Sequence, residues 1–255
     1  MLNQFKETAN TETILNISFF SGSISEVLKL IKKGGLLTAP SGPGLANDLP
    51  NSFEYRRSLE RSDIVLADSG LLCLWSRFFS KKTLRRLSGL EFLRKFLQCI
   101  DFLNDSTFWV MPDYLQSQKN CAWLKREFGA DIDQGYIYIA PKYSSNSCIN
   151  DHALLTKIEQ KQPKYIFIQL GGGVQERLGI FLKENLSYKT SIICTGAALA
   201  FLSGCQVRIP NWVDFIYMGW LYRCISNPKV FLPRYFKAFR LLILLFKYRE
   251  KSPMI

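Results

Sequence analysis

The segment at residues 163–177 constrains the fold more than any other part of the chain. It reads as a buried β-strand over residues 165–170, then three glycines, then a helix that begins at Val174. Glycine lacks a Cβ, so it permits positive φ angles and the close approach of a ligand. The free N–H groups at a helix N-terminus suit a phosphate or a sugar. Because neither the Walker pattern nor the dinucleotide fingerprint is present, we interpret the segment as a sugar-nucleotide or small-molecule turn. A simple strand-to-helix turn is the alternative.

Strand-like and helix-like segments alternate along the chain. Strands are predicted at residues 14–20, 36–39, 63–68, 107–111, 136–140, 165–170 and 191–194. Helices are predicted at residues 23–33, 52–61, 71–79, 89–99, 116–128, 152–160, 175–184 and 197–203, and residues 40–44 form a Pro/Gly loop. This alternation predicts an α/β, Rossmann-like parallel sheet with helices on both faces.

Three predicted strand ends carry candidate site residues. They are Thr38 before its Pro/Gly loop, Asp68 before Ser69, and the glycine turn before Gln175. Ligands of open α/β sheets bind beyond the carboxyl ends of the strands. Asp68 is predicted to act as a general base, with a helix N-cap as the alternative role. Gln175 and Glu176 are placed to hydrogen-bond a ligand.

The chain shows little sign of a metal site or of a histidine-based triad. His152 is the single histidine and is predicted to lie on the surface. Asp131 and Asp133 form an Asp-x-Asp pair, for which a metal role stays an alternative. The seven cysteines have neither metal nor disulfide spacing. Residues 1–13 are polar and lack a signal-peptide core, so a cytosolic location is expected.

Positive charge dominates the chain and concentrates near its end. The formal net charge is +12, which predicts an anionic partner: nucleic acid, anionic lipid or a nucleotide diphosphate. Residues 205–255 hold nine basic and two acidic residues, an excess of seven. Their longest apolar run, residues 241–246, is too short to span a membrane. The stretch over residues 212–248 is expected either to lie in a membrane interface or to pack on the core as a helix.

Several ordered segments resemble one known family. They are residues 38–40, 62–69, 86–91, 171–176, 196–212, 219–223 and 227–235. Together they resemble the motifs of the WecG/TagA/CpsF family of bacterial glycosyltransferases over residues 14–237. The chain departs from the family pattern at Pro40 or Ser41, Gly173, Ala200, Val230 and Pro233. A catalytically impaired nucleotide-sugar-binding homologue is therefore the alternative to an active enzyme.

The resemblance implies an inverting, metal-independent transferase without a cofactor. It would move a hexose or N-acetylhexosamine from a UDP-sugar to a polyprenyl diphosphate-linked acceptor in bacterial surface polysaccharide synthesis. Asp68 and Gln175 would be catalytic. The predicted substrate-binding residues are Thr38, Ser41, Ser69, Glu91, Gly171, Gly172, Gly173, Glu176, Arg208, Arg223 and Arg234.

The same interpretation divides the chain and places it in the cell. Residues 1–212 would form the α/β catalytic core, and residues 213–255 a basic helical appendage that binds the membrane and the acceptor. The protein would be cytoplasmic and peripheral on the inner face of the membrane. No nucleic-acid partner is expected, although the charge alone would allow one, and homo-oligomers are left open.

Overall fold

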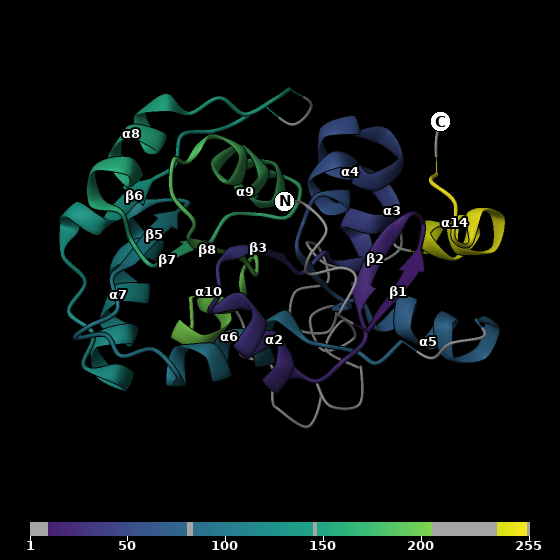
Figure 1. The fold of residues 1–255 in the computed structure, drawn as a ribbon, viewed down its shortest axis with the longest axis horizontal. Helices are drawn as coiled ribbons and strands as arrows, with labels where there is room; N and C mark the ends of the chain where they lie inside the picture. Colours follow the sequence, from purple (N-terminus) through teal and green to yellow (C-terminus); the bar gives the residue numbers. More distant parts are fainter. Residues whose placement is uncertain (1–9, 81–83, 145–146, 206–238, 254–255) are drawn as a thin grey trace.

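The computed structural model describes residues 10–80, 84–144, 147–205 and 239–253. In these ranges, eight strands form one sheet with helices on both faces (Figure 1). The sheet order is β1-β2-β4-β3-β8-β7-β5-β6, and only the β1–β2 pair is antiparallel. The strands are β1 (Thr11–Ile14), β2 (Ile17–Phe20), β3 (Gly35–Thr38), β4 (Ile64–Leu66), β5 (Thr107–Met111), β6 (Ile137–Ile139), β7 (Tyr165–Ile168) and β8 (Ser191–Cys194). The predicted α/β, Rossmann-like fold is confirmed.

Alternating side chains of the strands build a core on each face of the sheet. In β7, Tyr165 and Phe167 face one core while Ile166 and Ile168 face the other. The first core is covered by α2 (Ile24–Ile31), α6 (Gly89–Gln98), α7 (Tyr114–Phe128) and α10 (Ala198–Ser203). The opposite face is covered by α3 (Gly42–Asn51), α4 (Phe53–Glu60), α5 (Gly70–Phe79), α8 (His152–Lys161), α9 (Val174–Asn185) and α14 (Arg240–Tyr248). A short 3₁₀ turn, η1 (Gln134–Tyr136), precedes β6.

The prediction of one strand over residues 14–20 is wrong, because β1 and β2 form a hairpin there. Leu15 and Asn16 make its two-residue turn at φ angles of 54° and 63°. The apolar side chains around the turn conceal it in the sequence. The chain's C-terminal part holds it: Leu15 N donates to Arg249 O at 2.7 Å, and Asn16 N donates to Glu250 O at 2.9 Å.

The prediction of a loop over residues 40–44 is also wrong, because α3 begins inside it. Ser41 is the N-cap of α3, and its Oγ accepts a hydrogen bond from Gly44 N at 3.4 Å. Pro43 lies in the first turn, where an N–H group has no partner within the helix and its loss costs nothing. By contrast, the helix predicted over residues 23–33 is confirmed as α2, which begins with a capping box of Ser23 and Glu26.

The C-terminal helix α14 packs on the core through one side. Leu241, Leu244 and Leu245 are buried against α3 and α5. The sequence left two alternatives for this segment, a membrane interface or packing on the core. Helix α14 packs on the core. The predicted domain boundary at residues 212–213 lies outside the described residues. None of the helices in the described ranges has the length and apolarity that a membrane span requires.

Candidate functional site

The loops that follow β3, β4 and β7 meet at the carboxyl edge of the sheet. A Cβ built on Gly42, after β3, would lie 3.0 Å from Ser69 Oγ, after β4. A Cβ built on Gly172, after β7, would lie 3.9 Å from Ser41 Oγ. Ser41 and Ser69 are the N-caps of α3 and α5. The three strand ends that the sequence singled out therefore lie together, beside two helix N-termini that attract negative charge.

The glycine turn leaves room at its surface. A Cβ on Gly171 would meet no atom within 4 Å, and one on Gly172 would approach only Ser41. Gly173 has a φ of 87°, a value that L side chains rarely adopt, and a Cβ there would lie 3.3 Å from Asp48 Oδ2. Gly171 and Gly172 are exposed. A ligand can therefore approach the backbone of the turn directly.

Asp68 is anchored to the first residue of α6. Its Oδ1 accepts a hydrogen bond from Gly89 N at 3.0 Å, and Arg86 Nη2 lies 3.9 Å from the same oxygen. Arg86 Nε also donates to the backbone oxygen of Asp68 at 3.1 Å. The N-cap of α5 is Ser69, so Asp68 does not have the alternative role of capping that helix. The N-terminal end of α6 and the guanidinium of Arg86 thus hold the carboxylate of Asp68 in place at the edge of the sheet.

Gln175 and Glu176 hold the backbone of two neighbouring turns. Glu176 Oε2 accepts a hydrogen bond from Gly173 N at 2.7 Å, and Glu176 Oε1 accepts one from Gln175 Nε2 at 3.0 Å. Gln175 Oε1 in turn accepts a hydrogen bond from Gly196 N at 2.6 Å, in the turn after β8. Both side chains are buried. They therefore fix the glycine turn against the neighbouring turn from beneath.

The carboxyl group of Glu176 has an unusual protonation equilibrium. Burial raises its pKa to about 7, although hydrogen bonds from Gln175 and Gly173 N act in the opposite direction and Asp48 adds to the rise. Tyr55, whose ring lies close to Gly44, also has a raised pKa, because of its burial and the nearby Glu176 and Asp48. The interior behind the glycine turn is thus a place where negative charge is disfavoured.

The other predicted site residues are buried in the sheet, exposed on α6 or outside the described residues. Thr38 is fully buried and donates from Oγ1 to Ser62 Oγ at 3.2 Å. Glu91, in the first turn of α6, forms an ion pair with Lys95 at 2.8 Å, and its side chain is about half exposed. Three of the predicted substrate-binding residues lie outside the described residues: Arg208, Arg223 and Arg234. The roles of all these residues stay predictions.

Sequence reasoning missed the buried Arg177, which ties the glycine turn to another loop. Its Nε donates to Gly173 O at 2.8 Å, and its two terminal nitrogens donate to Ser147 O at 2.6 Å and Ser144 O at 2.9 Å. The sequence signal that could have identified Arg177 is its position directly after Gln175 and Glu176. Asp48 offered none, because the helix α3 that carries it was predicted in part as a loop.

Comparison with known proteins identifies the chain's relatives. A family model described as the glycosyl transferase WecG/TagA/CpsF family matches residues 12–253. An N-acetylglucosaminyldiphosphoundecaprenol N-acetyl-beta-D-mannosaminyltransferase of Bacillus subtilis (strain 168) is 24% identical over 225 residues, covering 86% of this chain and 84% of the relative. A protein of the same description from Bacillus spizizenii (strain ATCC 23059 / NRRL B-14472 / W23) is 22% identical over 204 residues, which cover 80% of this chain and 76% of the relative.

Proposed function

The chain belongs to the glycosyl transferase WecG/TagA/CpsF family and is a glycosyltransferase, and we propose which reaction it performs. The donor is a UDP-sugar that carries a hexose or N-acetylhexosamine. The acceptor is a glycan linked to a polyprenyl diphosphate, as the names of the two relatives suggest. The product serves surface polysaccharide synthesis. One observation supports this proposal above others: the exposed glycine turn lies beside two helix N-termini at the edge that also carries Asp68.

The proposed chemistry is a single displacement. Asp68 accepts the proton of the acceptor hydroxyl, whose oxygen forms a bond to the anomeric carbon of the donor. The bond between that carbon and the diphosphate oxygen breaks, and its electron pair leaves with UDP. Attack from the side opposite the leaving group inverts the anomeric configuration. Gln175 acts as a positioning residue, because it holds the turns after β7 and β8 together.

We propose that the departing diphosphate is stabilised without a metal ion. The N-terminus of α3 lies next to the glycine turn and that of α5 lies next to α3, and both offer positive dipole ends to an anion. Arg208, Arg223 and Arg234 would add the charge-assisted hydrogen bonds that phosphates prefer. A chelator should then leave the reaction unchanged.

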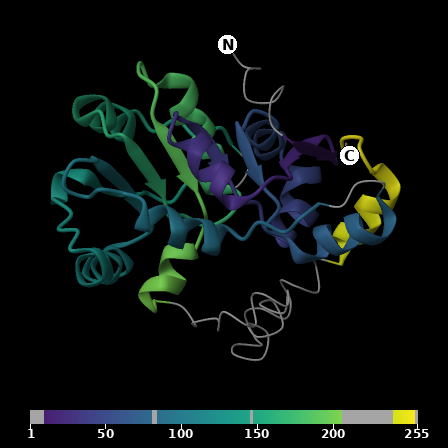
Figure 2. The same ribbon diagram turned by 60° about the horizontal axis from the view of Figure 1, so that its bottom comes forward.

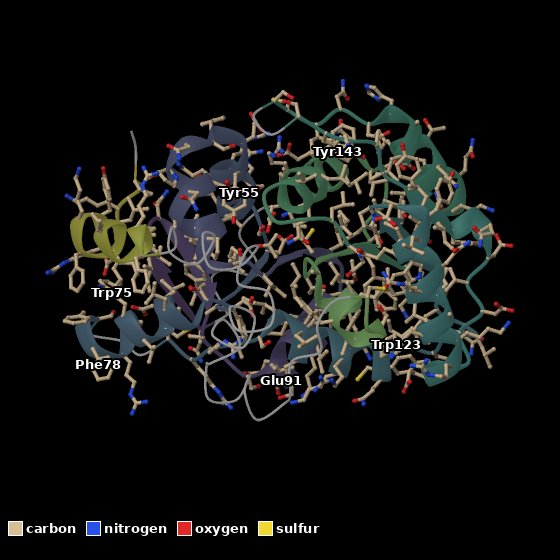
Figure 3. The ribbon with its side chains drawn as sticks, turned by 180° about the vertical axis from the view of Figure 1, so that it is seen from behind. Tyr55, Trp75, Phe78, Glu91, Trp123 and Tyr143 are labelled. Carbon is tan, nitrogen blue, oxygen red and sulfur yellow. The ribbon has the colours of Figure 1, made fainter. Side chains whose placement is uncertain are left out.

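A membrane surface is the proposed second partner, and we name the surface that would meet it the α5–α14 face. It comprises Leu74, Phe78, Phe79, Ile243 and Phe246, all large apolar side chains that are exposed. The two helices lie side by side (Figure 2), and the rings of Phe79 and Phe246 are 4.8 Å apart. Figure 3 shows Phe78 at the outer end of α5, near α14. Soluble surfaces rarely gather so many apolar side chains without a partner.

Basic side chains border the α5–α14 face. Arg77 and Lys247 are exposed on the same two helices, and Arg249 and Lys251 follow α14. Each Lys or Arg near an anionic bilayer contributes about 1 kcal/mol of binding free energy. Aromatic rings in the interface and lysines at lipid phosphates would together hold the enzyme near its lipid-linked acceptor.

The reaction is tested by incubating the full-length protein with a panel of UDP-sugars and a lipid-linked acceptor. We expect UDP release that depends on the acceptor, persists in EDTA and gives a product of inverted anomeric configuration by NMR. Loss of activity in EDTA would refute metal independence. Binding of UDP-sugars without turnover of any of them would favour the non-catalytic homologue instead.

A further inference from the structure

Two polar side chains at the carboxyl ends of β7 and β8 are buried without partners. Gln169 follows β7 and is 2% exposed, and Thr195 follows β8 and is 7% exposed. Within the described part of the chain, Gln169 Nε2, Gln169 Oε1 and Thr195 Oγ1 have no hydrogen-bond partner. Nearly all buried polar atoms in native proteins are hydrogen-bonded, so three orphaned atoms at one place require an explanation.

The two side chains are neighbours on the same face of the sheet. The parallel register pairs Ile168 with Cys194, which sets the next residues, Gln169 and Thr195, side by side. Tyr165, Phe167 and Ile193 point toward the core under α6, and the twofold alternation of strands directs Gln169 and Thr195 the same way. A Cβ on Gly89, the first residue of α6, would lie 3.9 Å from Thr195 Cβ.

The surrounding polar groups are already engaged. On the far side of Gln169, the register places Met111 of β5, whose Sδ accepts from Asn120 Nδ2 at 3.4 Å. Asn120 Oδ1 accepts from Ser203 Oγ at 2.7 Å. Among the residues that the structure describes, none therefore satisfies the amide of Gln169. Gly171, Gly172, Gly196 and Ala197 are exposed or half-exposed, so the pair lies just beneath the surface at the carboxyl edge of the sheet.

The three orphaned atoms offer a distinctive set of donors and acceptors. Thr195 Oγ1 can donate, Gln169 Oε1 accepts and Gln169 Nε2 donates, and the amide is free to take either orientation. The imide edge of uracil presents the complement: a carbonyl, an N–H and a second carbonyl. An acetamido group of a sugar fits less well, since its N–H and C=O point in opposite directions and cannot both meet one carboxamide.

We propose that Gln169 and Thr195 read the uracil base of the nucleotide-sugar donor through its imide edge. The proposal rests on the proposed function for its donor class and adds a base-recognition site to it. The position agrees with this role: three strand spacings, about 14 Å, separate β7 from β4, whose end carries Asp68. The base is the part of a nucleotide-sugar farthest from the reacting carbon. Because the pair is buried, the residues that cover it must move when a base binds.

The test measures nucleotide affinity by calorimetry with the full-length protein. Gln169→Met removes both amide groups at similar volume, and Thr195→Val removes the hydroxyl. The matched control is Thr190→Val, on the opposite end of β8, where the hydroxyl donates to Pro163 O at 2.9 Å. Melting temperatures accompany each titration, since removing unpaired buried polar groups should preserve or raise the melting temperature of the two test variants.

We expect the wild type to bind UDP more tightly than N3-methyl-UDP, in which the imide N–H is blocked. Gln169→Met should weaken the binding of UDP and of UDP-N-acetylmannosamine equally, by about tenfold, and remove the preference over N3-methyl-UDP. Thr195→Val should act in the same direction, and Thr190→Val should leave all affinities unchanged. An effect on UDP-N-acetylmannosamine without an effect on UDP would assign the pair to the sugar and overturn the proposal.

Two further results separate this inference from the proposed function. If the wild type binds UDP and Gln169→Met binds it equally well, the pair is a structural feature that holds at most a buried water, and only the inference fails. If the wild type binds no uridine nucleotide at all, the proposed donor is wrong and the inference falls with it.

Discussion

Replacing Glu176 by glutamine should remove most of the pH dependence of stability between pH 5 and 8.5. The carboxyl group is buried, and its pKa is raised from the ordinary 4.5 to about 7, chiefly by burial. A raised folded-state pKa means that the folded chain holds the proton more tightly than the unfolded chain does. The stabilisation is therefore complete below pH 4.5 and is lost as the pH rises through 7.

The magnitude follows from that difference. At about 1.4 kcal/mol per pKa unit, a rise from 4.5 to about 7 corresponds to about 3 kcal/mol of unfolding free energy. Wild type should lose up to this amount between acidic and alkaline pH. Glu176→Gln keeps the shape and can still accept a hydrogen bond from Gly173 N, but it carries no titrating proton. Its stability should stay nearly level across the same range.

The assay is urea unfolding at several pH values for wild type, Glu176→Gln and a control. Glu184→Gln is the matched control, because Glu184 lies on the same helix, near the surface, and pairs with Arg57 at 2.7 Å and Arg61 at 2.6 Å. The control should follow the wild-type pH profile, offset by a constant. Parallel profiles for wild type and Glu176→Gln would refute the argument that burial raises this pKa.

Three further substitutions test the site and the membrane face. Asp68→Asn should keep the fold and nucleotide affinity and lower turnover by about 10²–10⁴-fold, the usual contribution of a positioned base; near-wild-type turnover would remove Asp68 from the mechanism. Gly172→Val should fold normally, since only Ser41 Oγ lies near its Cβ at 3.9 Å, and should abolish UDP-sugar binding in a calorimetric titration; unchanged affinity would move the site elsewhere. Phe78→Ser combined with Phe246→Ser should reduce co-sedimentation with anionic vesicles at low salt, and high salt should release the wild type; equal sedimentation of both would contradict a docking role for the α5–α14 face.

The sequence predicted the strands and turns that position the site, because short local patterns of residues determine them. The strand Tyr165–Ile168 is apolar throughout, as a central parallel strand must be, and the glycines follow shortly after its end. The capping box at Ser23 fixed the start of α2 in the same way. Alternation then required the strand ends to share an edge, which is where Ser41, Ser69 and Gly172 meet.

What the sequence could not predict depends on contacts between distant segments. The hairpin turn at Leu15 and Asn16 is held by backbone oxygens of residues 249 and 250, which no local pattern encodes. The sequence could not decide whether α14 packs on the core or lies in a membrane interface, since one helix can bury Leu241 and still expose Phe246. Nor does a single sequence reveal that Gln175 bonds Gly196, because that contact depends on how β7 and β8 align.

The central claim is that this chain transfers a sugar from a nucleotide donor to a lipid-linked acceptor. The most direct measurement is mass spectrometry of an N-acetylglucosaminyl-diphospholipid incubated with the full-length protein and UDP-N-acetylmannosamine. We expect the lipid to gain the mass of one N-acetylhexosamine in step with UDP release, and to remain unmodified with Asp68→Asn over the same period. A lipid of unchanged mass with every UDP-sugar tried, although the wild type is folded and binds UDP, would contradict the account.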